Sequence, residues 1–331
     1  MKQSAADRPD PTTQRKAAIA RGAALEHTGK VRVEAIPAFD LGRTIFKTLE
    51  GKLARLVVAS RVGKEVYWDG DAAAAVQAEY AAARAAHTLP VVNAELLDFL
   101  VRECDFDVEH ADGSFLDHLY FCFEYTVQHY PAGSPLVMLL HSILGTGTNT
   151  FAMTADKIPA LQALVPPADW VQIEAFPSVL RLLYAGSLRR ELRENLHGAN
   201  VMKSISLHRV IDNAPIMMTG EQFWVALNYQ LIHLVDFLPV ANWTAYRNDP
   251  LFLLFRDLYD LLARAGKLEA KVGFTPPADG PRTLQGEQPQ GLGGWLSTHI
   301  PPSVGERMAA KSVERFSARI GHSLEYMIFW G

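Results

Sequence analysis

Apolar residues recur at three- and four-residue intervals along most of the chain, which is the spacing of one face of an α-helix. Several of these segments start with a residue that caps helices, such as Asn93, and end at a proline or a glycine, such as Gly266. The pattern predicts helices over about residues 41–62, 69–87, 91–104, 113–130, 134–144, 156–165, 169–186, 187–198, 219–239, 248–267 and 303–320.

Strand patterns are weak by comparison. Residues 29–39 and 204–211 show some alternation of apolar and polar side chains, which predicts short edge strands at most. We therefore expect a mainly α fold, a helical bundle with N- and C-terminal helical extensions. The expected organisation is a mobile tail over residues 1–15, an N-terminal helical extension over 16–92, a helical domain over 93–265, and a Pro/Gly-rich segment with a closing helix over 266–331.

Composition narrows the class of protein. The 331 residues are 49% hydrophobic, which is enough for a sizeable core. A net charge of −4 without a basic block argues against nucleic-acid binding, and two cysteines are too few for a disulfide framework. The N-terminal segment has no apolar signal core, and the apolar runs are far shorter than the roughly 20 residues of a membrane-spanning helix. These features predict a cytoplasmic protein without membrane segments.

Histidines in the apolar helices are the candidate chemistry. His118 and His141 fall in two consecutive helices, and His233 and Asp236 are three residues apart on one face of a later helix. Imidazoles and carboxylates on packed helices are a common way to bind a divalent metal. A single histidine in an apolar helix is more often a core residue with one hydrogen bond, so the metal interpretation depends on several of these residues meeting.

The segments "DHLYFCFEY", "LVMLLHS" and "HLVDF" together resemble the HD-domain superfamily, whose pattern is H…HD…D on a helical bundle. The resemblance implies an HD-like fold for the helical domain and metal ligation by His118, His141 and Asp236, with His233 as an additional ligand. Position 142 is Ser instead of the Asp of that pattern, and "HSILGT" resembles an HD-like subgroup with HS-x-x-GT. Because a serine hydroxyl brings no charge to a metal, the expected cofactor is a divalent metal (Fe, Mn or Zn), in the form of a single ion.

The polar loop after His141 is the candidate substrate contact. Ser142, Thr146 and Thr148 can offer hydroxyl groups, and their loop can offer backbone N–H groups, to a substrate anion. The predicted function is a metal-dependent enzyme that acts on a small polar metabolite, by hydrolysis or by iron-dependent oxygenation. The alternative is an HD-like scaffold that has lost catalysis and serves as a binding or structural protein.

Overall fold

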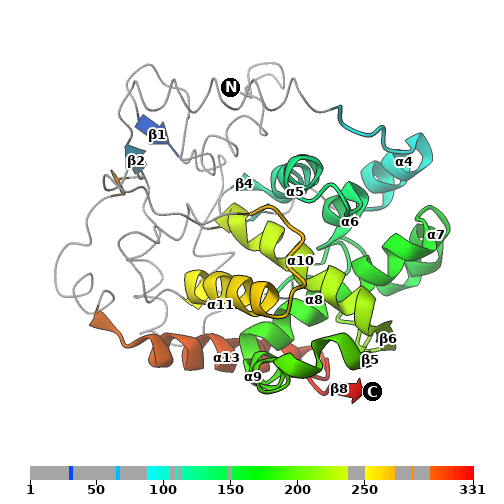
Figure 1. The fold of residues 1–331 in the computed structure, drawn as a ribbon. Coiled ribbons are helices and arrows are strands. Elements are labelled where there is room, and N and C mark those ends of the chain that lie inside the picture. Colours follow the sequence, from blue (N-terminus) through cyan, green and yellow to red (C-terminus); the bar gives the residue numbers. More distant parts are fainter. Residues whose placement is uncertain are drawn as a thin grey trace.

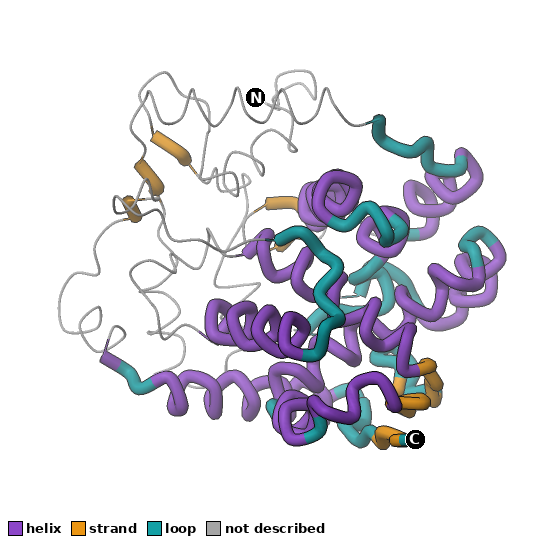
Figure 2. The backbone as a smooth tube through the Cα atoms, in the orientation of Figure 1, coloured by secondary structure: helices purple, strands orange, loops and turns teal. Residues whose placement is uncertain are grey.

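Helices predominate in the computed structural model of the chain (Figures 1 and 2). The structure describes residues 30–32, 65–67, 88–104, 109–110, 113–147, 149, 151–237, 250–272, 285–286 and 299–331. Its α-helices are α4 (Ala94–Glu103), α5 (Phe115–His129), α6 (Pro135–Leu140), α7 (Ile158–Ala163), α8 (Pro167–Ala185), α9 (Ser187–Glu194), α10 (Gly220–Phe237), α11 (Pro250–Arg264) and α13 (Pro302–Arg319), with 3₁₀ turns η3 (Ala155–Lys157) and η4 (Leu196–Val201).

Local capping explains where several helices begin and end. Asn93 accepts a hydrogen bond from the N–H of Glu95 through its side chain, as expected for an N-cap of α4. At α10, Thr219 Oγ1 accepts from the N–H of Gln222, and Gln222 Oε1 accepts from the N–H of Thr219. This reciprocal pair is a capping box, and it fixes the start of the helix that carries His233 and Asp236.

A three-stranded antiparallel sheet, in the order β6–β5–β8, packs against α8 and α10. Its strands are β5 (Met202–His208), β6 (Pro215–Thr219) and β8 (Met327–Trp330). The expectation of edge strands was wrong for residues 204–211, because β5 pairs on both sides and forms the centre of the sheet. Gly220 follows β6 where the chain approaches β5 closely, since a Cβ there would lie 2.0 Å from the carbonyl oxygen of Met202.

Helix α8 runs through the middle of the described residues and contacts α6, α9, α10, α13 and β5 (Figure 1). Most of its apolar side chains, among them Ile173, Phe176 and Val179, are completely or almost completely buried. Helices α5 and α6 pack against each other, and α10 packs against both α5 and α8. The helices that carry the candidate ligands are therefore neighbours in the folded chain.

Several expectations concern residues outside this description. The tail 1–15 and the helices expected over 41–62 and 69–87 lie outside the described residues. Within the extension expected over 16–92, β1 (Lys30–Arg32) and β2 (Glu65–Tyr67) form an antiparallel pair, and β7 (Gln285–Gly286) pairs with β2. A further pair joins β3 (Glu109–His110) and β4 (Gly113–Ser114) before α5. No helix within the described residues combines the length and apolar character needed to cross a membrane.

Asn228 connects α10 to the segment after α11. It is buried, its Nδ2 donates to the carbonyl oxygens of Trp224 and Lys267, and its Oδ1 accepts from the N–H groups of Glu269 and Ala270. The side chain thus links α10 to the backbone of residues 267–270.

We expect Asn228→Ala to lower the free energy of unfolding by about 2–4 kcal/mol, because it leaves buried N–H groups without acceptors. Urea unfolding measures this loss. Asn195→Ala is the control, since the Asn195 side chain donates to one carbonyl of its own helix, that of Glu191. Equal losses in both variants would contradict a connecting role for Asn228.

Candidate functional site

Two of the candidate ligands, His141 and His233, meet in the core. Their ring centroids lie 4.9 Å apart with an interplanar angle of 69°. His141 follows the last residue of α6 and is 0% exposed, while His233 lies in α10 and is 6% exposed. Phe176 of α8 packs its ring edge-on against both imidazoles, with centroid distances of 4.7 Å to His141 and 5.2 Å to His233. The three rings thus come from the residue after α6, from α8 and from α10.

The His141 ring has a defined orientation. Its Nδ1 lies 2.7 Å from the carbonyl oxygen of Met138, one of the last carbonyls of α6. A carbonyl only accepts, so Nδ1 carries the proton and Nε2 carries the lone pair of the neutral ring. Burial lowers the pKa of His141 to about 4, which keeps the ring neutral at neutral pH. A neutral imidazole whose other nitrogen donates to a carbonyl is the usual form of a metal-binding histidine.

The other two candidate ligands, His118 and Asp236, lie on α5 and α10. His118 belongs to α5, one turn before the buried Cys122, and Asp236 belongs to α10, one turn after His233. The side chains of both residues lie outside the described part of the structure. Among the side chains that are described, no group of three or more His, Cys, Asp or Glu residues could hold a metal ion. Convergence of all four candidate ligands remains a prediction.

The loop after His141 is enclosed by other parts of the protein. Ser142 and Thr146 are both buried, at 5% and 7% exposure, and Thr148 lies outside the described residues. Thr146 contributes its carbonyl oxygen to Arg181 of α8, which binds it through Nε at 3.2 Å and through Nη2 at 2.7 Å. Whether the hydroxyl groups of this loop bind a substrate remains a prediction.

Arg181 is a charged residue that the sequence pattern did not single out. It is 0% exposed and also donates to Asn149 Oδ1 at 2.7 Å and to Ser317 Oγ at 3.1 Å, while Asn149 donates to the carbonyl of Phe316. These acceptors are all neutral, and burial lowers the pKa of Arg181 to about 10. Arg181 therefore stays charged at neutral pH and holds the loop between α8 and α13.

His322 extends this polar cluster toward the sheet. It is buried, and its Nε2 lies 3.0 Å from the carbonyl oxygen of His208, so Nε2 is the protonated nitrogen. Its Nδ1 lies 3.2 Å from Ser317 Oγ and can accept a hydrogen bond from that hydroxyl group. Burial, more than the nearby Arg181 charge, lowers the pKa of His322 to about 4.

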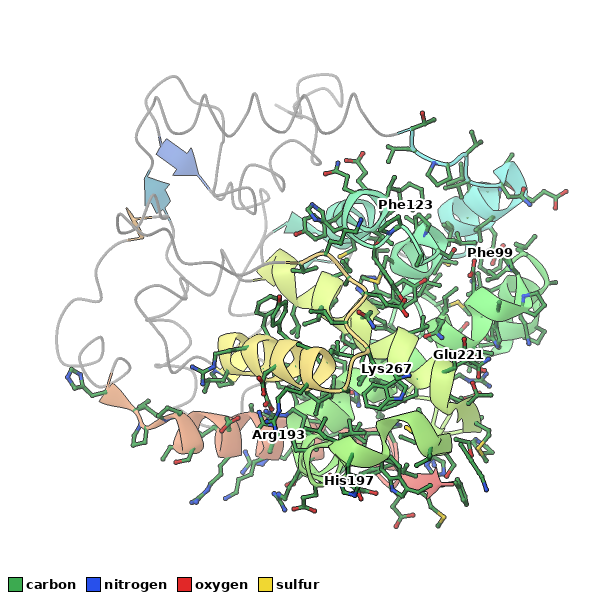
Figure 3. The ribbon with its side chains drawn as sticks, in the orientation of Figure 1. Phe99, Phe123, Arg193, His197, Glu221 and Lys267 are labelled. Atoms are coloured by element: carbon green, nitrogen blue, oxygen red, sulfur yellow. The ribbon has the colours of Figure 1, made fainter. Side chains whose placement is uncertain are left out.

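A separate pocket of about 430 Å³ lies between α9, α11 and α13. Its lining is highly charged: Arg189, Arg193, Arg256, Asp257, Asp260 and Glu306, with Leu253 and Pro302. Arg189 contacts Asp257 at 2.6 Å and Glu306 at 3.3 Å, and Arg193, labelled in Figure 3, also pairs with Asp257. These ion pairs tie three helices together, and the lining contains none of the candidate ligands.

Comparison with protein-family models, with curated proteins and with solved structures finds no match for this chain. The resemblance to the HD-domain superfamily therefore rests on the residues quoted above.

The buried His322 predicts a specific pH dependence of stability. Its folded-state pKa of about 4 lies below the ordinary value of 6.5, so between these values the unfolded chain binds the proton more strongly. Stability should therefore fall as the pH drops from 6.5 to 4, by up to about 1.4 kcal/mol per pH unit from this residue. His322→Gln keeps a donor and an acceptor but cannot titrate, so its stability should decline less steeply.

Urea unfolding at several pH values between 4 and 7 measures this difference. His197→Gln is the control, because His197 is exposed (labelled in Figure 3). The same pH slope in wild type and His322→Gln would rule out the neutral, buried state of His322.

Proposed function

We propose that this protein is a metal-dependent enzyme of HD-like fold, which acts on a small polar metabolite. The metal site would lie where α5, α6 and α10 meet, with His118, His141, His233 and Asp236 as ligands. The contact between the His141 and His233 rings is the observation that carries the proposal, because it brings together two candidate ligands from helices 92 residues apart in sequence.

The chemistry of the cluster fits a borderline divalent ion. His141 is held in the tautomer whose Nε2 carries a lone pair, which is the form that can coordinate a metal. Its low pKa means that almost no proton competes with the metal near neutral pH. Asp236 would add one negative charge from the face of α10 that carries His233. Ser142 adds none, so a single Fe, Mn or Zn ion fits this donor set better than a pair of ions.

Bound in this site, a metal would supply either a bound water of lowered pKa for hydrolysis or, as iron with open positions, activation of O₂. The residues of the chain would set the environment of that reaction. Phe176 would keep bulk water from the two imidazoles, and the Met138 carbonyl would fix the orientation of the His141 ring. Thr146 and Ser142 would line the side of the site that follows His141.

The alternative function is a binding or structural protein on an HD-like scaffold without catalysis. One observation favours it: the His141 ring already caps a free carbonyl of α6, which is sufficient reason for a histidine at this position. Metal content distinguishes the two functions.

We expect protein purified without chelators to contain about one Fe, Mn or Zn ion per chain, since a site with several protein ligands retains its ion. His141→Ala and His233→Ala should each lose most of this metal while they remain folded, with His141→Ala costing about 1 kcal/mol for the lost hydrogen bond. Elemental analysis and thermal unfolding provide the two readouts. His197→Ala should keep wild-type metal content. Metal-free wild-type protein that also fails to bind added Fe²⁺, Mn²⁺ or Zn²⁺ would leave the scaffold alternative standing.

Ser142→Asp tests the HD resemblance itself. If the site lacks one carboxylate relative to that pattern, the new charge should tighten divalent-metal binding by about tenfold or more, because carboxylates are preferred ligands of hard cations. Isothermal titration with Mn²⁺ measures the change. Unchanged or weaker Mn²⁺ affinity in a folded Ser142→Asp variant would count against an HD-type arrangement at this position.

A further inference from the structure

Gln230 is a buried polar residue of α10 beside the imidazole cluster. It is 0% exposed, and its Nε2 donates to the carbonyl oxygen of Phe176 at 3.1 Å. The orientation of the amide follows from this bond, because a carbonyl can only accept and so requires the nitrogen of the amide to face it. The amide oxygen, Oε1, must then point to the other side.

That oxygen has no hydrogen-bond donor among the described residues, although it is completely buried. A buried carbonyl oxygen without a partner costs on the order of 1–3 kcal/mol, and most such atoms in folded proteins bind a donor or an ion. The position therefore calls for a proton donor or a cation that is not part of the described chain.

Gln230 is a neighbour of the two imidazoles in the fold. Gln230 precedes His233 by three residues, so both side chains project from the same face of α10. Phe176 joins them from α8, because its carbonyl binds Gln230 while its ring contacts both His141 and His233. Phe176 of α8 thus contacts the side chains of Gln230, His141 and His233.

We infer that Gln230 is a further ligand of the metal site, binding the ion through Oε1. This inference rests on the proposed function, which supplies the metal. An amide oxygen is a neutral donor to divalent cations and would add oxygen ligation to the two imidazoles without adding charge. Gln230 would also couple the ion to α8, since its other amide atom is held by the Phe176 carbonyl.

Gln172 of α8 offers a matched control. It is also buried, its Nε2 donates to the carbonyl of Gln222 at 3.0 Å, and its Oε1 likewise lacks a donor among the described residues. Its partner Gln222 lies eight residues before Gln230, about 12 Å away along α10. Loss of either amide should therefore affect stability similarly, whereas loss of Gln230 alone should affect metal binding.

The experiment is isothermal titration of the metal-free full chain with Mn²⁺, using wild type, Gln230→Met and Gln172→Met. Methionine has a similar size but no oxygen. Gln230→Met should bind Mn²⁺ at least about tenfold more weakly than wild type, and Gln172→Met should bind like wild type. Should Gln230→Met not fold, Gln230→Glu decides, because a charged oxygen at the same place should bind Mn²⁺ more tightly than the amide does.

The possible results separate the two proposals. Wild-type affinity in both methionine variants, or no gain in Gln230→Glu, would overturn the role of Gln230 and leave the metal site intact. Equal weakening in Gln230→Met and Gln172→Met would also overturn it, by indicating a general effect of core disruption. Failure of the wild-type chain itself to bind Mn²⁺, Fe²⁺ or Zn²⁺ would overturn the proposed function and this inference together.

Discussion

Buried polar atoms need partners, and this requirement governs the arrangement around Phe176. His141 Nδ1 donates a hydrogen bond to the Met138 carbonyl, and Gln230 Nε2 donates one to the Phe176 carbonyl. Both bonds fix side chains of α6 and α10 against backbone atoms of α6 and α8. The Gln230 amide oxygen is also buried, and it has no hydrogen-bond donor among the described residues. The proposed metal ion would be the partner of that oxygen.

A second polar cluster, centred on Arg181, supports the first from the C-terminal side. Arg181 and Asn149 connect the loop after His141 to α13, which begins more than 150 residues later in the chain. His322 then connects the end of α13 to the last carbonyl of β5. The positions of Ser142 and Thr146 therefore depend on the C-terminal helix as well as on α6. This dependence explains why a loop of small and polar residues can be buried in the fold.

Periodicity and capping made most helices predictable, because those signals are local: Asn93 caps α4, and the closing helix was expected within one residue of its ends. The sheet was less predictable, since β5 is completed by the last residues of the chain. His141 and His233 are in contact, and their role as metal ligands stays a prediction. Gln230 was missed because its partner is a backbone carbonyl, which leaves no mark in the sequence. Arg181 was missed because its partners come from distant parts of the chain, at Thr146, Asn149 and Ser317. His118 and Asp236 keep the status of predicted ligands.

X-ray absorption spectroscopy of the Zn²⁺-loaded protein tests the central claim, that the His141–His233 contact is part of a metal site, most directly. The account predicts at least two imidazole nitrogens at about 2.0–2.1 Å from the ion, and one fewer in His141→Ala. A shell of water and carboxylate oxygens alone, or a spectrum that His141→Ala leaves unchanged, would show that the two histidines are core residues and would contradict the account.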